Sequence, residues 1–171
     1  MRFMERCRAP ASLLVAATAL MVSAFASPAA AQNVKWKTII GIIQAGNLVG
    51  GIQGGGQPWS TLGGHANVDL SSGKVDFEVR GLVLAGGNTI GSPGAITQVK
   101  GTLACIVAGV AQTFDTPLVP LSSRGDAEFD GNIGPIATTC TPTNAVFLVR
   151  IPSTPTDRWI ANGAVRTAPG Q

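Results

Sequence analysis

Three carboxylates alternate along one short segment of the chain. Asp126, Glu128 and Asp130 occupy positions i, i+2 and i+4, so in an extended strand they project from the same face. Clustered carboxylate oxygens are the ligands that Ca²⁺ prefers in proteins, and Asp69 and Asp76 of a predicted hairpin are two further candidate ligands. However, the sequence has no Asp-x-Asp-x-Asp-Gly loop, and exposed carboxylates about 4 Å apart repel by only about 1 kcal/mol in water. A solvated acidic face therefore fits better than a calcium site, and no cofactor is predicted. The cations expected to pair with this face are Lys74, Arg80 and Lys100.

His65 is the single histidine of the sequence, so any imidazole chemistry must use it. Asp69 lies on the same predicted strand and Glu78 on the next one, which makes these three the candidates for acid–base catalysis in a hydrolase or isomerase. Residues i and i+4 of a strand lie roughly 13 Å apart, however, which is too far for a hydrogen bond. Ser60 also lacks the Gly-x-Ser-x-Gly context of a hydrolase nucleophile. The sequence favours a structural or solvent-exposed histidine and leans against an enzyme.

Tryptophans are the third group with chemical potential. Trp59 lies in a Gly/Pro-rich segment, where loops expose recognition residues, and Trp159 lies near the end of the chain. Either indole could stack on a sugar or an apolar ligand. The sequence favours packing of these two and of Trp36 in the core, because large aromatic side chains dominate small cores and this chain has few others.

The N-terminal segment predicts export. Three arginines in the first eight residues precede an apolar stretch from Ala11 to Ala26, and Ala29-Ala30-Ala31 supplies small residues for signal peptidase. We expect residues 1–31 to be removed by cleavage after Ala31, with a cut after Ala26 as the alternative. An uncleaved segment would instead anchor the protein in a membrane. The alanine-rich style is typical of bacterial signals, so the protein is expected to be secreted or periplasmic.

Two cysteines, Cys105 and Cys140, remain after removal of the signal, which contains Cys7. In an exported chain such a pair is most simply a disulfide. Closing a loop of this length is expected to stabilise the fold by roughly 3–4 kcal/mol.

Residues 32–171 suit a single domain, with residues 167–171 expected to be disordered. Without the signal, the chain has a net charge near +1 and no basic cluster. This charge pattern excludes an electrostatic footprint for nucleic acid or an anionic membrane.

The residues that could do chemistry must be positioned by short strands, because apolar residues of residues 32–171 recur with a period of two. The clearest element is a hairpin in which residues 65–70 and 75–80 flank the turn Ser71-Ser72-Gly73. Its simplest register places Asp69 opposite Asp76 and His65 opposite Arg80. Further strands are expected at 35–43, 96–107, 125–133, 145–151 and 157–165, with an edge or crossing segment at 115–121 and a Gly-rich hairpin and loop at 46–56.

About eight short strands with frequent turns predict an all-β fold, either a small antiparallel β-sandwich or a β-barrel, with one disulfide. We expect a secreted, non-enzymatic β domain that binds a partner or a surface, the partner being a protein, a glycan or a small apolar ligand. The alternative is a small β-barrel that carries an apolar ligand in an internal cavity. Residues expected to line that cavity are Phe77, Val79, Leu103, Phe147 and Val149.

Overall fold

The computed structural model describes residues 32–153 and 155–166. The predicted signal segment 1–31 and the tail 167–171 lie outside the described residues, so the cleavage site and the disordered tail stay predictions. The described elements are all β-strands, which confirms the all-β class.

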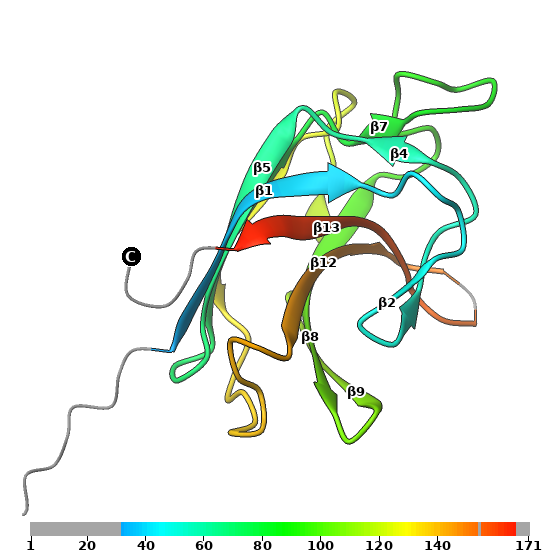
Figure 1. The fold of residues 1–171 in the computed structure, drawn as a ribbon. Helices are drawn as coiled ribbons and strands as arrows, with labels where there is room; N and C mark the ends of the chain where they lie inside the picture. Colours follow the sequence, from blue (N-terminus) through cyan, green and yellow to red (C-terminus); the bar gives the residue numbers. More distant parts are fainter. Residues whose placement is uncertain (1–31, 154, 167–171) are drawn as a thin grey trace, which may run out of the picture.

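One antiparallel sheet curls into a half-barrel (Figure 1). Eight strands follow one another along the curl, and β9 (Val110–Asp115) pairs with β8 beside them. The predicted choice between a sandwich and a barrel is thus answered by a single curled sheet. In spatial order the eight strands are β10 (Val119–Pro120), β8 (Gln98–Val107), β12 (Ala145–Ile151), β13 (Arg158–Arg166), β1 (Asn33–Gly41), β5 (Gly63–Asp69), β6 (Lys74–Arg80) and β11 (Ala127–Asn132).

Most predicted strands are confirmed, including the apolar segment 145–151. This segment is β12, which lies between β8 and β13 and is buried at five of its seven positions. The predicted edge segment forms β10, at one end of the sheet. Pro120 suits that place because proline has no backbone N–H to donate to a second neighbouring strand.

The core on the concave side is built from aromatic rings. Phe147 packs against Trp36 and Phe77, with ring centroids 5.8 and 5.4 Å apart, and Phe129 stacks on Phe77 at 6.3 Å. All of these but Phe129 are almost fully buried. The sequence pattern places them here because each stands at an inward position of a strand with period two.

The β5–β6 hairpin is confirmed, but its predicted register is wrong by two residues. His65 pairs with Glu78 and Asn67 with Asp76, whereas Arg80 lies opposite Gly63. The turn has the expected length but lies one residue nearer the N-terminus, at residues 70–73. The Asp69 carboxylate holds it there by accepting hydrogen bonds from Ser71 and Ser72, and the Gly73 amide donates to the Asp69 carbonyl. A shift of two residues keeps every side chain on its predicted face.

Strand β9 was not predicted. It forms a tight hairpin with β8, in which Val107 pairs with Val110 across the two-residue turn Ala108-Gly109. Both turn residues have positive φ, 49° and 80°, as a type I′ turn requires. Ala-Gly lacks the Asn-Gly or Asp-Gly signature of such turns, so no local pattern indicates this hairpin.

The Gly-rich segment 46–56 folds over the convex side of the sheet. It contains the ribbon of β2 (Leu48–Val49) and β3 (Ile52–Gln53), which confirms the predicted hairpin (Figure 1). The Trp159 indole donates a hydrogen bond of 3.0 Å to the Asn47 carbonyl, and the Gly55 amide donates to the Trp159 carbonyl at 2.8 Å. Gly54 and Gly55 are buried, so this part of the segment is fixed against the sheet. A second ribbon joins β4 (Trp59–Ser60) to β7 (Val83–Leu84).

Candidate functional site

Polar side chains form two rows across the convex face of β5, β6 and β11. In the first row His65, Glu78 and Glu128 are register neighbours, and in the second Asn67, Asp76 and Asp130 are neighbours. The alternation of inward apolar and outward polar residues in the three strands creates these rows. The structure therefore brings together residues that the sequence placed in two separate candidate groups.

His65 lies between two carboxylates of β6. Its Nε2 is 3.2 Å from Asp76 Oδ2, and its Nδ1 is 3.7 Å from Glu78 Oε2. Both ring nitrogens thus face acids of the protein itself. The structure does not join His65 to Asp69, which lies in the turn. Of the predicted catalytic candidates, only His65 and Glu78 are brought into proximity.

Asp69 is occupied by the turn that it closes. The Ser71 and Ser72 hydroxyls donate to its two carboxylate oxygens at 2.6 and 2.8 Å. These side-chain hydrogen bonds, together with that of the Ser71 amide, lower the pKa of Asp69 to about 2. This carboxylate therefore fixes the turn.

The predicted calcium ligands are spread over separate places: Asp69 in the turn, Asp126 before β11, and Asp76, Glu128 and Asp130 on the convex face. Asp76 accepts a hydrogen bond from Asn67, and Asp130 pairs with Lys74 at 3.7 Å. Within the part of the chain that the structure describes, no three His, Cys, Asp or Glu side chains are grouped as a metal site. Of the expected cationic partners, Lys74 and Arg80 do pair with this face, whereas Lys100 pairs elsewhere.

A groove of about 560 Å³ opens where the two end strands of the sheet, β10 and β11, approach each other. Its apolar wall comes from strand residues of β6, β10 and β11, and its polar rim carries three carboxylates. The lining residues are Glu78, Val79, Val119, Pro120, Ser122, Asp126, Ala127 and Glu128.

The three rim carboxylates differ in how they are engaged. Asp126 accepts a hydrogen bond of 3.0 Å from the Gly81 amide, which ties the groove to the end of β6. Glu78 is 3.3 Å from Arg80 Nε. Glu128 is exposed and has no ion-pair partner among residues 32–153 and 155–166. The groove therefore presents net negative charge beside an apolar wall, a combination suited to a cationic group with an apolar portion.

The tryptophans do not line this groove. Trp59 and Trp159 are only 5% and 3% exposed, so the accessibility considered for Trp59 is not observed. Trp159 is covered by the Gly-rich segment, and Trp59 stands in the β4–β7 ribbon. Core packing, favoured by the sequence, is found for these two and for Trp36.

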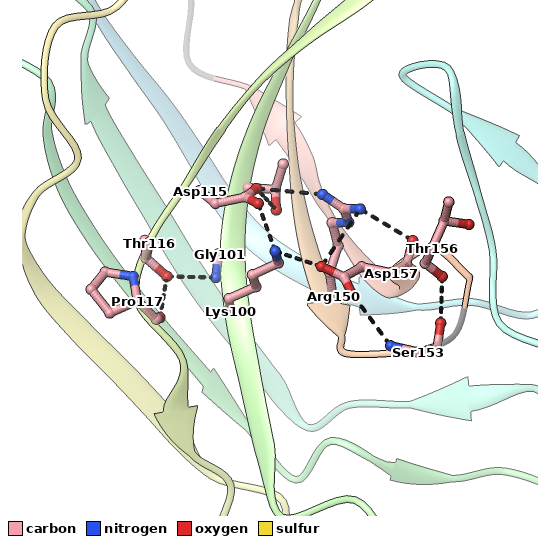
Figure 2. A network of polar contacts seen from close by, with 10 residues as sticks. Lys100, Gly101, Asp115, Thr116, Pro117, Arg150, Ser153, Thr156 and Asp157 are labelled. Carbon is pink, nitrogen blue, oxygen red and sulfur yellow. Dashed lines mark hydrogen bonds and ion pairs between the residues drawn. The ribbon is translucent and has the colours of Figure 1, made fainter.

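A second polar cluster, the ion network, joins four segments on the other half of the sheet (Figure 2). Lys100 Nζ on β8 lies 2.6 Å from Asp115 Oδ2 and 2.5 Å from Asp157 Oδ2. Arg150 on β12 reaches Asp115 Oδ1 at 3.4 Å and donates to the Asp157 carbonyl at 3.2 Å. Thr102 donates to Asp115 at 2.7 Å.

The ion network is electrically balanced, and its pKa shifts follow from its hydrogen bonds. Burial opposes the charge on Lys100, but hydrogen bonds to Asp115 and Asp157 outweigh it and raise the pKa of Lys100. Burial likewise opposes the charge on Asp157, yet Lys100 and the Ser153 amide lower the pKa of that carboxyl. Two cations matched by two carboxylates point to a structural clamp between strands.

The ion network could not be predicted from the sequence. Lys100 and Arg150 are the charged residues of two largely apolar strands, and charges in such surroundings need partners. Asp115 stands at the end of β9, the strand that was not predicted, so its position next to Lys100 could not be derived.

The predicted disulfide between Cys105 and Cys140 is confirmed, with a Cα–Cα distance of 5.5 Å. It links β8 to the segment that leads into β12, and both cysteines are buried. A disulfide indicates an oxidising compartment outside the cytoplasm.

Among the described residues, no helix has the length and apolar character needed to cross a bilayer. In comparisons with protein-family models, with curated proteins and with solved structures, no match to this chain is found.

Proposed function

We propose that the protein is an exported, non-enzymatic β domain that binds a partner through the groove between β10 and β11. The observation that carries this proposal is the groove itself, about 560 Å³ in volume, with an apolar wall and the rim carboxylates Glu78, Asp126 and Glu128. Concave sites with an apolar surface and a few convergent polar groups are the usual form of binding sites.

Binding is favoured over catalysis by the surroundings of His65. Its two ring nitrogens face Asp76 and Glu78, so neither is directed at a substrate position. Cys105 and Cys140 are joined to each other and supply no thiolate nucleophile.

A surface site is also favoured over an internal apolar carrier. Phe77, Leu103 and Phe147, which would have to line an internal cavity, are at most 1% exposed. The rings of Phe77 and Phe147 pack against each other, and Gly101 lies directly against both. A ligand in this position would have to displace the aromatic core.

Export is part of the proposal. The basic and apolar start of the chain and the Cys105–Cys140 disulfide both support a periplasmic or extracellular location, in a bacterium by the style of the signal.

The test is site-specific photo-crosslinking in the cells that export the protein. A photoreactive amino acid at Pro120, on the groove wall, is expected to give a defined adduct. The same residue at Thr113, an exposed position of β9 outside the groove lining, is the matched control and is expected to give none. Equal labelling from both positions, or none from Pro120, would overturn the proposal.

A further inference from the structure

We infer that the partner bound in the groove is an extended polypeptide segment with alternating apolar and basic residues, which adds to the sheet along the free edge of β11. This inference rests on the proposed function, because it specifies what occupies the groove between β10 and β11.

The first observation is the open sheet edge. β11 and β10 are the two ends of the strand order, and β11 pairs through all six of its residues with β6 alone among the described strands. β10 approaches part of the opposite edge, where Cα atoms of the two strands lie within 8 Å of each other. The rest of that edge presents backbone amide and carbonyl groups without a strand partner in the described chain. Such an edge is a template for an added strand.

The second observation is the alternation of side chains along that edge. Ala127 and Phe129 face the core side, whereas Glu128 and Asp130 face outward. An added strand would have the same alternation, with a period of two. One set of its side chains would contact the apolar wall at Val119, and the other set would lie beside the carboxylates.

The third observation is charge. Glu78, Asp126 and Glu128 line the groove, and Asp130 extends the acidic row beyond it. Lysine or arginine at the outward positions of the added strand would complement these carboxylates, since opposite charges on neighbouring strands stabilise their pairing.

The same charges disfavour a second copy of this chain as the occupant. Pairing of β11 with β11 of another molecule would bring the Glu128 and Asp130 carboxylates of the two copies together, and like charges on neighbouring strands destabilise pairing. A basic segment from a different protein can form hydrogen bonds with the backbone edge of β11 and also complement its negative charge.

The experiment uses a seven-residue probe with free ends blocked, Val-Lys-Val-Lys-Val-Lys-Val, titrated into the oxidised protein of residues 32–171. Calorimetry gives the affinity, and amide chemical shifts locate the site. We expect saturable binding with the largest shifts in residues 127–132, and at least about tenfold weaker binding by Glu128→Lys, because a repulsion replaces an attraction. Asp115→Asn, remote from the groove, is the matched protein control and should bind as wild type does.

Two control peptides separate pairing from charge. A peptide with the same side chains but N-methyl groups on alternate residues cannot donate the edge hydrogen bonds, and it should bind at least about tenfold more weakly. A peptide with glutamate in place of lysine should not bind.

The outcomes distinguish the two proposals. Equal binding of the N-methylated peptide would overturn strand addition. Absence of binding by all peptides, combined with a specific adduct from Pro120, would overturn the basic-strand partner and leave a groove-binding function in place. Loss of that adduct as well would overturn both. A dimer formed through β11 without any peptide would also contradict the inference.

Discussion

Gly101 on β8 gives room to the ring of Phe77. A Cβ at position 101 would lie 2.8 Å from Phe77 Cε1, and the same distance from Cζ of Phe147. Real Cβ atoms do not approach this closely, so the absence of a side chain at this inward position lets the two rings meet at the centre of the curled sheet.

Gly101→Ala is therefore expected to destabilise the protein by about 1–3 kcal/mol, because the rings must leave their positions to admit one methyl group. The measurement is the free energy of unfolding in urea. Gly56→Ala is the control, since nothing lies within 4 Å of a Cβ at that position, and it should change stability by less than about 0.5 kcal/mol. Equal effects of the two substitutions would contradict this account of the core.

The strands and their faces could be predicted because both depend on local alternation. Val99, Leu103 and Cys105, at alternate positions of one predicted strand, are buried, and so is Ala127 of another. The order of the strands in the sheet could not be predicted, since β1 pairs with β13, the first and last of the described strands, and such a distant pairing leaves no local signal. The exact register of β5 and β6 depends on how Asp69 binds Ser71 and Ser72, which alternation does not encode.

The residues of the candidate site could be predicted from the sequence, but their meeting at one groove could not. Glu78, Asp126 and Glu128 were each singled out from the sequence, for catalysis or for calcium. Their meeting at one groove follows from the pairing of β11 with β6 and from the approach of β10, which are long-range features. The alternation of carboxylates predicts a shared face, and β11 has Glu128 and Asp130 exposed on the same face, whereas Asp126 lies before the strand.

Removal of the disulfide is expected to cost roughly 3–4 kcal/mol, because the bond closes a loop with a sequence separation of 35 residues in the unfolded chain. The double variant Cys105→Ala, Cys140→Ala provides the test by urea unfolding, with the reduced wild-type protein as its companion. A loss below about 1 kcal/mol in both would contradict the stabilising role.

Lys100→Met is expected to destabilise the protein by about 1–3 kcal/mol at pH 7, since it leaves the carboxylates of Asp115 and Asp157 partly buried without their nearest cation. The pKa of Asp157 is lowered in the folded state, so its contribution is present above its unfolded pKa and is lost as the pH falls through the folded one. The difference in the free energy of unfolding between wild type and variant should consequently become smaller below about pH 4. A difference that does not change with pH would contradict an ionic origin of the stabilisation by Lys100.

The matched control for the ion network is Lys74→Met. Lys74 pairs with Asp130 at 3.7 Å, and both side chains are more than 60% exposed, at 64% and 68%. Exposed pairs contribute little, so this variant should lose less than about 0.5 kcal/mol under the same conditions.

Asp69→Ala is expected to cost about 1 kcal/mol near neutral pH, because the exposed turn loses its acceptor for Ser71 and Ser72. The pKa of Asp69 is about 2 in the folded protein and 3.8 in its ordinary state. The stabilisation that Asp69 contributes is thus fully present above pH 3.8 and disappears as the pH falls through about 2. Urea midpoints of wild type and variant should converge over this interval, whereas Asp130→Ala, which leaves the turn intact, should show no such convergence.

The acidic residues of β11 are also expected to prevent self-association of the protein. Glu128 and Asp130 lie along an edge that has no strand neighbour in the described chain, and charges on such an edge oppose pairing between identical molecules. The double variant Glu128→Val, Asp130→Thr keeps high strand propensity and removes both charges. We expect it to fold but to associate in a concentration-dependent way, detectable by light scattering after size-exclusion chromatography. The matched control is Asp76→Asn, which removes a charge from the neighbouring strand β6 without altering the edge, and it should remain monomeric if wild type is.

Monomeric behaviour of the double variant at high concentration would mean that another feature protects this edge, and it would weaken the case for strand addition there.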